Sequence, residues 1–374
     1  MKFIHISDLH LGKRLHEASL IEDQQTILWQ ILNIIDAENP SGILIAGDIY
    51  DKSVPSAEAV SLFDSFLAEL AKRRLEVFII SGNHDSAERI AFGSKIMDGM
   101  GIHLSPVYDG KILPTTLKDD DGEVDVYMLP FIKPSHVRRF YENEDINSYT
   151  DAVRVAVENM NIDKSKRNVL IAHQFVTGAI RSESEETVGG TDNVDAAVFE
   201  NFDYVALGHL HSSQFCSTEK IRYSGTPLKY SFSEAKDTKS VTVVTLVKKG
   251  ENPEIRAVEL KPVKDMQRIR GAFDDLMSVV ERTENYVQIT LTDEDDIPNA
   301  MSRLRAIYKN ALELKYDNTR TRAEAVIFGM EDAERKTPFE LFSEFFKDRN
   351  NAEMSDTQKN YIKNLIEKIE EEEA

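Results

Sequence analysis

The sequence is poor in cysteine, in long apolar runs and in positive charge. Cys216 is the single cysteine among 374 residues, so no disulfide can form within the chain and a reducing compartment is expected. We expect Cys216 to be a buried packing residue rather than a reactive thiol. The apolar runs are too short to span a bilayer, and residues 1–5 lack the apolar segment of a secretory signal. These absences predict a globular protein of the cytoplasm with no membrane partner.

Positive charge is scarce: 45 Lys and Arg stand against 65 Asp and Glu, which gives a formal net charge of −20. A protein whose main task is to coat nucleic acid carries the opposite balance. A phosphodiester substrate is still compatible with this charge, because metal ions set the field inside a metal cleft. Strong DNA binding would therefore need a partner or a local basic face.

Apolar runs that end in metal-competent residues are the main feature present. Each run is short and rich in β-formers, as a buried strand is, and such strands deliver their polar neighbours to one edge of a sheet. Five runs share this pattern: 3–7 before Asp8 and His10, 42–46 before Asp48, 77–80 before Asn83, His84 and Asp85, 168–172 before His173, and 204–207 before His209 and His211.

Strand and helix patterns alternate over the first part of the chain. Helices are predicted at 21–36, 56–73 and 149–161, and further strands at 124–129 and 241–247. This order predicts helices packed on a largely parallel sheet. Residues 177–193 are predicted to form a long surface loop.

From about residue 263 the predicted strands no longer end in metal-competent residues, so we place a domain boundary at 250–265. A small α+β module is predicted there, with helices at 266–282 and 298–310 and strands at 286–291 and 312–316. Capping boxes at 337–340 and 355–358 predict a purely helical end. The expected domains are residues 1–260, 264–335 and 337–374.

The residues at the strand ends suit a pair of divalent ions. Such a pair needs about four ligands per ion and usually a bridging carboxylate. Mixed imidazole and carboxylate ligands favour Mn, Fe or Zn over Mg. Asp8 and Asp48 are the only anionic ligands, so the ions keep positive charge that favours a phosphate, and they lower the pKa of bound water. Each Asp, Asn or His alone is more easily explained as a turn or core residue, but together they predict phosphoester hydrolysis.

The same motifs resemble those of calcineurin-like metallophosphoesterases, whose fold has mixed sheets flanked by helices. Longer motifs resemble those of the SbcD family of nuclease subunits, among them Asp8–Gly12, Phe202–His209 and Tyr223–Pro227. These are the bacterial counterparts of the meiotic-recombination repair nuclease. The match spans most of the chain and weakens after about residue 260.

The resemblance implies a role for each matched residue. Asp8, His10, Asp48 and His211 would hold one Mn²⁺, and Asp48 would bridge to a second ion held by Asn83, His173 and His209, with Mg²⁺ possible in part. His84 would contact the phosphate and protonate the leaving oxygen. Asp85 would orient His84, although a simple loop-stabilising role is as well supported. Asp51 stands where archaeal and eukaryotic relatives carry a His.

The family also implies partners and substrates. The expected function is an Mn-dependent exonuclease on double-stranded DNA and endonuclease on single-stranded or hairpin DNA, serving DNA repair, recombination and replication. A homodimer within a heterotetramer is implied, together with an SbcC-type coiled-coil ATPase that regulates the complex. The alternatives are an enzyme of small phosphodiesters or phosphomonoesters, and a scaffold with a vestigial site.

Two further residue sets are predicted to serve these partners. A capping module over the cleft would contact DNA, unless its basic residues form only a solvated helix face. The terminal helices would bind the ATPase, unless they dock on their own module. The DNA set is Arg303, Arg305, Arg320 and Arg322, and the partner set is Phe339, Phe342, Phe346, Tyr361 and Leu365.

Overall fold

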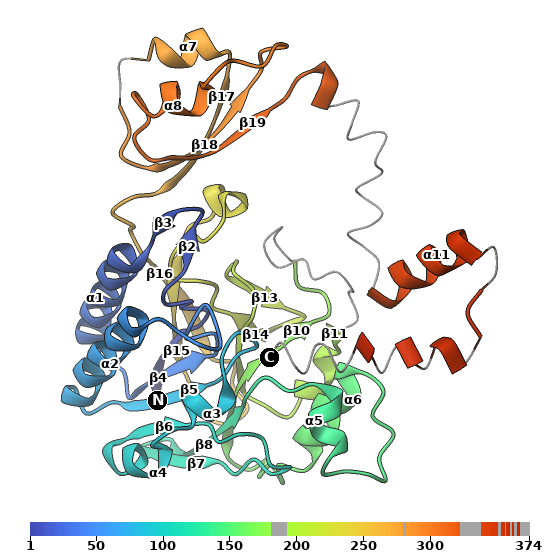
Figure 1. The fold of residues 1–374 in the computed structure, drawn as a ribbon. Helices are drawn as coiled ribbons and strands as arrows, with labels where there is room; N and C mark the ends of the chain where they lie inside the picture. The colour runs from blue at the N-terminus through green and yellow to red at the C-terminus, as the bar shows by residue number, and fades with distance from the viewer. Residues whose placement is uncertain are drawn as a thin grey trace.

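Two six-stranded mixed sheets stacked face to face form the body of the molecule (Figure 1). The computed structural model describes residues 1–180, 193–279, 282–321, 338–350, 353–355, 357–359, 361–362 and 365–366. The first sheet has the order β16 (Glu254–Glu259), β15 (Ser240–Thr245), β1 (Lys2–Ile6), β4 (Gly42–Ala46), β5 (Glu76–Ile80) and β6 (Ile102–Leu104). The second has the order β13 (Gln214–Cys216), β14 (Thr218–Tyr223), β12 (Tyr204–Gly208), β9 (Arg167–His173), β8 (Gly122–Leu129) and β7 (Thr115–Asp119).

The central strands of both sheets are parallel. In the first sheet β1, β4, β5 and β6 run parallel, and β15 and β16 are added antiparallel. In the second sheet β14, β12, β9 and β8 run parallel, and β13 and β7 are antiparallel edges. The carboxyl ends of neighbouring parallel strands therefore lie at the same edge of each sheet.

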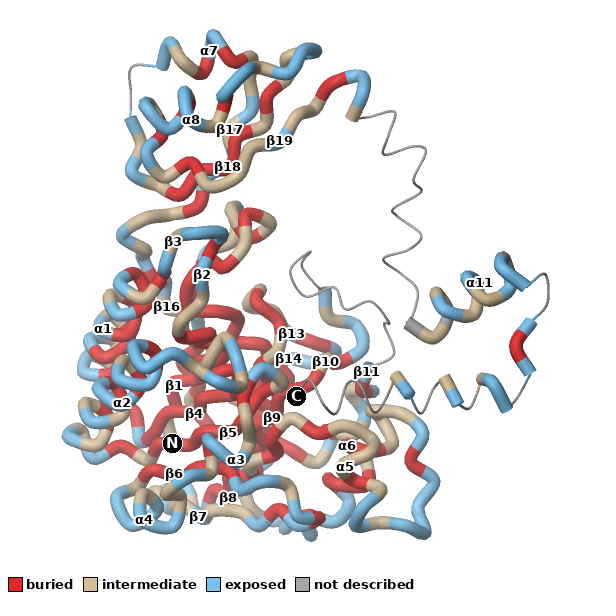
Figure 2. Tube along the Cα trace, in the orientation of Figure 1, coloured by how far each residue is buried: buried red, intermediate tan, exposed pale blue. Residues whose placement is uncertain are grey.

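Side-chain alternation explains why these strands are apolar throughout. In β4, Leu44 and Ala46 pack between the two sheets, and Ile43 and Ile45 pack outward under helices. A strand buried on both faces is a continuous apolar run rather than an alternating one. The outer covers are α1 (Ile21–Glu38) and α2 (Ala57–Lys72) on the first sheet, and α5 (Pro134–Arg138) and α6 (Tyr149–Glu158) on the second. Figure 2 shows the buried residues concentrated in this double-sheet body.

A separate C-terminal module (residues 266–316) stands above the body (Figure 1). Its three strands, β17 (Met266–Gly271), β18 (Tyr286–Leu291) and β19 (Ala311–Tyr316), are parallel and have their own apolar core. The helix predicted at 266–282 is wrong: β17 pairs with β18, and among the described residues after it in this stretch only α7 (Phe273–Met277) is helical. Sheet pairing here outweighs a helical apolar pattern. The helix predicted at 298–310 shortens to α8 (Ala300–Leu304).

The structure confirms some of the smaller predictions and not others. Strand β16 follows the strand predicted at 241–247, and neither β16 nor β7 was predicted. Helix α11 covers Pro338–Asn350, and Ser355 and Gln358 form the reciprocal capping bonds that the sequence predicts. The predicted loop at 177–193 lies mostly outside the described residues, as does Arg322. Among the helices described, none is long and apolar enough to cross a membrane.

The remaining elements are short. They are β2 (Arg14–Leu15), β3 (Ala18–Ser19), α3 (Ala87–Ile90), α4 (Ser94–Met97), η1 (Asp98–Met100), β10 (Phe175–Val176), β11 (Asn193–Val194), η2 (Ala196–Phe199) and η3 (Phe232–Lys236).

Candidate metal centre

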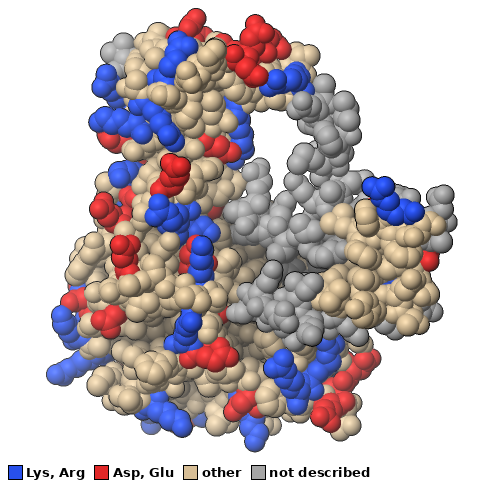
Figure 3. All heavy atoms as spheres, in the orientation of Figure 1, with Lys and Arg blue, Asp and Glu red and all other residues tan. Residues whose placement is uncertain are grey.

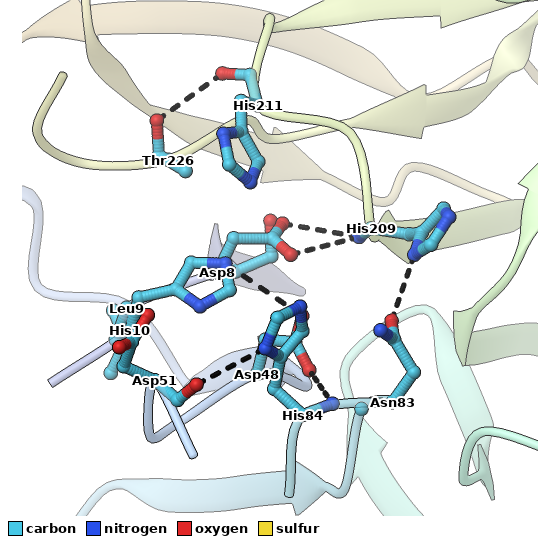
Figure 4. Close-up of polar contacts among 12 residues, drawn as sticks. Asp8, Leu9, His10, Asp48, Asp51, Asn83, His84, His209, His211 and Thr226 are labelled. Carbon is cyan, nitrogen blue, oxygen red and sulfur yellow. Dashed lines mark hydrogen bonds and ion pairs between the residues drawn. The ribbon is translucent and has the colours of Figure 1, made fainter. Parts of the chain in front are cut away.

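Residues at or directly after the carboxyl ends of β1, β4 and β5 in the first sheet and of β9 and β12 in the second lie close together. Figure 4 shows those that follow β1, β4, β5 and β12. The loop after β1 is tied to the loop after β12, because the backbone N–H of His209 donates to both Asp8 carboxylate oxygens at 3.0 and 3.2 Å. The loop after β4 is tied to the loop after β5, because the N–H of His84 donates to Asp48 Oδ1 at 2.9 Å. The predicted carboxylates thus anchor loops from elsewhere in the chain.

Imidazole and amide groups converge on the same point. Asn83 Oδ1 lies 3.0 Å from His173 Nε2 and 2.9 Å from His209 Nδ1. His173 Nε2 is also 3.4 Å from Asp48 and 4.0 Å from Asp8. Side chains from β1, β4, β5, β9 and β12 therefore share one small volume, as the strand-end pattern predicts.

Asp48 belongs to two groups of possible ligands. One joins Asp8, Asp48 and His173 and the other joins His10, Asp48 and His84, with the ligand atoms of each group within 4.8 Å of one another. The His10 ring nitrogens are both buried and have no hydrogen-bond partner among the described residues. An orphaned buried imidazole beside a shared carboxylate is what a metal ligand looks like before its ion is added. The residues present therefore fit a pair of divalent cations.

The charges of the buried groups support the same assignment. Burial raises the pKa of Asp8 to about 6, and the nearby Asp48 charge adds to this. Burial also opposes ionisation of Asp48, but His173 and His10 outweigh it and hold the pKa of Asp48 well below its ordinary value. Burial lowers the pKa of His173, yet the Asp48 carboxylate raises it more, to about 9. Without an ion, protonated His173 supplies the positive charge that Asp48 requires, so metal binding displaces a proton.

The backbone is strained where it presents these ligands. Left-handed φ angles occur at Asp8 (53°), His10 (42°), Asp48 (50°) and His209 (102°), all non-glycine residues. Such conformations persist only where the surroundings enforce them, and they cluster at functional sites. A Cβ at Gly208 would lie 1.9 Å from the carbonyl oxygen of Ala46, which also accepts a hydrogen bond from His173 Nδ1 at 2.8 Å. Close approach of the two sheets thus positions His173.

Glu234 in η3 contacts the predicted ligand His211 and was not predicted from the sequence. Its Oε1 lies 3.2 Å from His211 Nδ1, and its Oε2 accepts from Thr226 Oγ1 at 3.3 Å and from Lys239 at 2.6 Å. A carboxylate on one ring nitrogen fixes the orientation of a ligating histidine. Burial raises the pKa of Glu234, but His211 and Lys239 lower it more, to about 2. No strand end marks Glu234 in the sequence, so only the fold reveals it.

Asp85 does not orient His84 as the first of its two predicted roles requires. Its carboxylate accepts hydrogen bonds from the backbone N–H groups of Ile49, Tyr50 and Gly82, each at 3.0 Å. The exposed His84 ring is instead oriented by the Asp51 carbonyl oxygen, 3.1 Å from Nδ1. Asp85 therefore stabilises the loops, which was its alternative role, and its burial raises its pKa to about 6.

Of the predicted DNA-contacting arginines, Arg303, Arg305 and Arg320 lie in or directly after the C-terminal module, away from the strand-end residues, and Arg322 lies outside the described residues. Arg303 stacks on Phe273, Arg305 donates to the Ala311 carbonyl, and Arg320 pairs with Asp296. Figure 3 shows basic side chains gathered on the module and interleaved with acidic ones over the body. The structure gives Arg303, Arg305 and Arg320 contacts within the module and does not bring these three to the candidate centre.

The predicted partner-binding residues lie on α11 and the short helical segments after it. Phe342, Tyr361 and Leu365 are exposed, and Phe339 and Phe346 are partly buried. Phe345, which was not predicted, is also exposed, and its ring lies 6.4 Å from that of Phe342.

Comparisons with known proteins find family profiles, relatives and one solved structure that are similar to this chain. The calcineurin-like phosphoesterase profile matches residues 1–213, and the SbcD_C profile, described as a type 5 capsule protein repressor C-terminal domain, matches residues 262–350. The SbcD chain of the SbcCD nuclease from Staphylococcus epidermidis is 33% identical over 98% of both chains, and its counterpart from Staphylococcus saprophyticus is 34% identical over 84% of both. A dimetal phosphatase from Danio rerio aligns over 70% of this chain and 96% of its own, with a TM-score of 0.39 and 10% identity.

Proposed function

Because the chain belongs to the SbcD family of calcineurin-like phosphoesterases, we propose that it is the nuclease component of an ATP-regulated complex that processes DNA ends and hairpins. It would hydrolyse phosphodiester bonds as an exonuclease on double-stranded DNA and as an endonuclease on single-stranded and hairpin DNA. The observation that carries the proposal is Asp48, a buried carboxylate shared by two groups of ligand atoms.

Two divalent ions, Mn²⁺ for preference and Mg²⁺ in part, would be held by the residues at the strand ends. Imidazole ligands at His10, His173, His209 and His211 favour Mn²⁺ over the oxygen-rich sites that Mg²⁺ prefers. When bound, the ions supply Lewis-acid activation of water and phosphate. Asp8, His10, Asp48 and His211 would hold one ion, and Asp48, Asn83, His173 and His209 the other.

His84 would act as the general acid of the reaction. The Asp51 carbonyl lies at Nδ1 and so keeps a proton on that nitrogen. A proton taken up at Nε2 is then the one that can be delivered to the leaving oxygen. Exposure of His84 at the mouth of the site leaves it accessible to a polymeric substrate.

Cleavage assays on three substrates test this function. The purified protein, with and without an SbcC-type ATPase, is given linear duplex DNA, hairpin DNA and a cyclic nucleotide in Mn²⁺ and in chelator. We expect Mn²⁺-dependent cleavage of both DNAs and loss of this cleavage in Asp48→Asn and His84→Gln. The control His16→Gln alters an exposed histidine outside the strand-end residues and should cleave as the wild type does. Turnover of the cyclic nucleotide alone would indicate an enzyme of small phosphodiesters. Full nuclease activity in His84→Gln would refute the role of His84 as the general acid.

The C-terminal helices would bind the coiled coil of the ATPase through their exposed aromatic residues. Phe342 and Phe345 lie side by side on α11, and Tyr361 and Leu365 are exposed beyond it. An amphipathic helix that exposes apolar side chains suits a helix-in-groove partner. Deleting residues 337–374 should abolish co-purification with the ATPase and spare Mn²⁺-dependent cleavage of a small phosphodiester. Co-purification that survives the deletion would refute this part.

A homodimer would form through the exposed apolar side chains around α4. Phe92, Ile96 and Met100 are 82%, 74% and 66% exposed. Large apolar side chains exposed to this extent suit an interaction surface. We expect Ile96→Glu to halve the mass measured by light scattering, and Val263→Glu, an exposed position elsewhere, to leave it unchanged. An unchanged mass in Ile96→Glu would place the interface elsewhere.

A further inference from the structure

Behind the candidate centre, Gln24 holds the backbone of the loop that carries His10. Gln24 is buried in the first turn of α1. Its Nε2 donates to the His10 carbonyl at 2.7 Å and lies 3.3 Å from the Leu9 carbonyl, and its Oε1 accepts from the Gly12 N–H at 3.0 Å. One side-chain amide therefore fixes both ends of loop 9–12.

Tyr230 holds the same loop from a second direction. Its hydroxyl lies 3.1 Å from Gln24 Nε2 and donates to the Leu9 carbonyl. Its ring is packed edge-on against His10, with centroids 5.6 Å apart. Gln24 and Tyr230 both contact the backbone of this loop, and Tyr230 also contacts the ring of His10. Neither of them is a predicted ligand.

His10 depends on these contacts more than the other predicted ligands do. Its φ of 42° is one that a non-glycine residue adopts only under constraint. Neither of its ring nitrogens has a hydrogen-bond partner among the described residues, whereas His173 and His211 are oriented by the Ala46 carbonyl and by Glu234. The direction of the His10 ring is therefore set by its backbone and by ring packing.

The residue before each holding group contacts the C-terminal module or Asp265, which leads directly into it. Next to Gln24, Asp23 Oδ2 accepts a hydrogen bond from Tyr286 at 2.7 Å, and both residues are buried. Next to Tyr230, buried Lys229 pairs with Asp265 at 2.8 Å. Tyr286 and Met266 of the module pack into the core of the body rather than into the core of the module. Two adjacent pairs, 23–24 and 229–230, thus join the module to the His10 loop.

We propose that Gln24 and Tyr230 are positioning residues for His10, and that the seating of the C-terminal module controls them through Tyr286–Asp23 and Asp265–Lys229. The inference rests on the proposed function, since it concerns the metal affinity of the same site. When the module is seated, the first turn of α1 and the 229–230 segment hold His10 toward Asp48. A partner or a DNA that shifts the module thereby changes metal affinity, and metal binding in turn tightens the module.

Metal titration of matched tyrosine variants tests the proposal. Tyr286→Phe removes only the hydroxyl that reaches Asp23. Tyr308→Phe is the control, because Tyr308 is also buried in the module but its hydroxyl donates at 3.3 Å to Leu276 within the module. Calorimetry with Mn²⁺ on the full chain should show one of two binding events weakened roughly 10-fold in Tyr286→Phe. Tyr308→Phe should bind as the wild type does.

Further variants separate positioning from simple loss of structure. Gln24→Glu, which replaces the donating amide with an acceptor, should weaken the same event more than Tyr286→Phe does, and Lys229→Met should weaken it as Tyr286→Phe does. Hydrogen exchange supplies the reciprocal readout: Mn²⁺ should add protection to residues 266–271 and 286–291 in the wild type and in Tyr308→Phe, but not in Tyr286→Phe.

The outcomes that overturn the inference differ from those that overturn the proposed function. Equal Mn²⁺ affinities for Tyr286→Phe and Tyr308→Phe, in a wild type that binds two ions, would refute the link between module and site. Wild-type affinity in Gln24→Glu would refute the positioning role. A wild-type chain that binds no Mn²⁺ would refute the proposed function itself.

Discussion

Replacing Glu234 by Gln tests how the fold supports the candidate metal centre. The substitution keeps the shape of the side chain and removes its charge. Lys239, also buried, then loses the carboxylate 2.6 Å from its Nζ and keeps the His211 carbonyl at 2.9 Å and Asp237 at 3.7 Å. His211 keeps only a neutral amide in place of the charged carboxylate at its Nδ1.

The cost follows from the pKa of Glu234, which falls from 4.5 to about 2 on folding. Each pKa unit corresponds to about 1.4 kcal/mol, so ionised Glu234 stabilises the folded chain by about 3 kcal/mol. Removing one member of a buried ion pair costs about 3–5 kcal/mol, which agrees. Because the folded pKa is the lower one, this stabilisation is present above pH 4.5 and is lost as the pH falls toward 2.

Urea unfolding in the presence of a chelator measures this effect on the metal-free protein. At pH 7 we expect Glu234→Gln to unfold with about 3 kcal/mol less free energy than the wild type. The difference should shrink between pH 4.5 and about 2, and the exposed control Glu219→Gln should show no difference at either end. A difference below about 1 kcal/mol at pH 7, or one that persists at low pH, would refute the reasoning, since surface pairs contribute no more than that.

Three further predictions address the loops and the module. Gly208→Ala places a Cβ 1.9 Å from the Ala46 carbonyl and should lower the free energy of unfolding, measured in urea, by about 1–3 kcal/mol. The control Gly99→Ala, whose added Cβ would have nothing within 4 Å, should unfold at the same urea concentration as the wild type. Asp85→Ala leaves three backbone N–H groups without their acceptor and should lower the stability measured by thermal unfolding by about 1–3 kcal/mol. The exposed control Asp120→Ala should unfold as the wild type does, and an equal melting temperature for Asp85→Ala would show that the Asp85 carboxylate does not stabilise the loops. Charge reversal of Arg320 and Arg322 should weaken DNA binding and flatten its dependence on salt relative to Lys72→Glu; an unchanged salt slope would identify a solvated face.

The fold class and the cluster of strand-end residues could be predicted because they depend on local rules. Apolar runs buried on both faces are visible in the sequence, and parallel strands bring their carboxyl ends to one edge, so Asp48, Asn83, His173 and His209 could be grouped before any coordinates were known. The family match confirms the calcineurin-like fold. Strand β17 was mistaken for a helix because its identity depends on pairing with β18, which no local pattern reveals.

Contacts that form only in the folded chain were beyond the sequence. Glu234 lies in a short 3-10 helix and meets His211 from 23 residues away. Gln24 has the spacing of an ordinary buried helix residue, and its bonds to the His10 carbonyl appear only when α1 packs beside loop 9–12. Asp85 follows His84 directly, yet its carboxylate turns to backbone groups of residues 49–50. Adjacency in sequence is a poor guide to which groups touch.

The candidate centre and the double sheet depend on the same contacts. Gly208 must approach Ala46 closely for the sheets to meet, and that approach places the Ala46 carbonyl at His173. The carboxylates of Asp8 and Asp48 hold the loops of His209 and His84 while also lying at the centre. Ions held there would join loops from both sheets, so metal binding should raise resistance to unfolding. The net charge of −20 is compatible with a phosphodiester substrate for the same reason, because the field at the centre is set by the ions and their few ligands rather than by the distant surface.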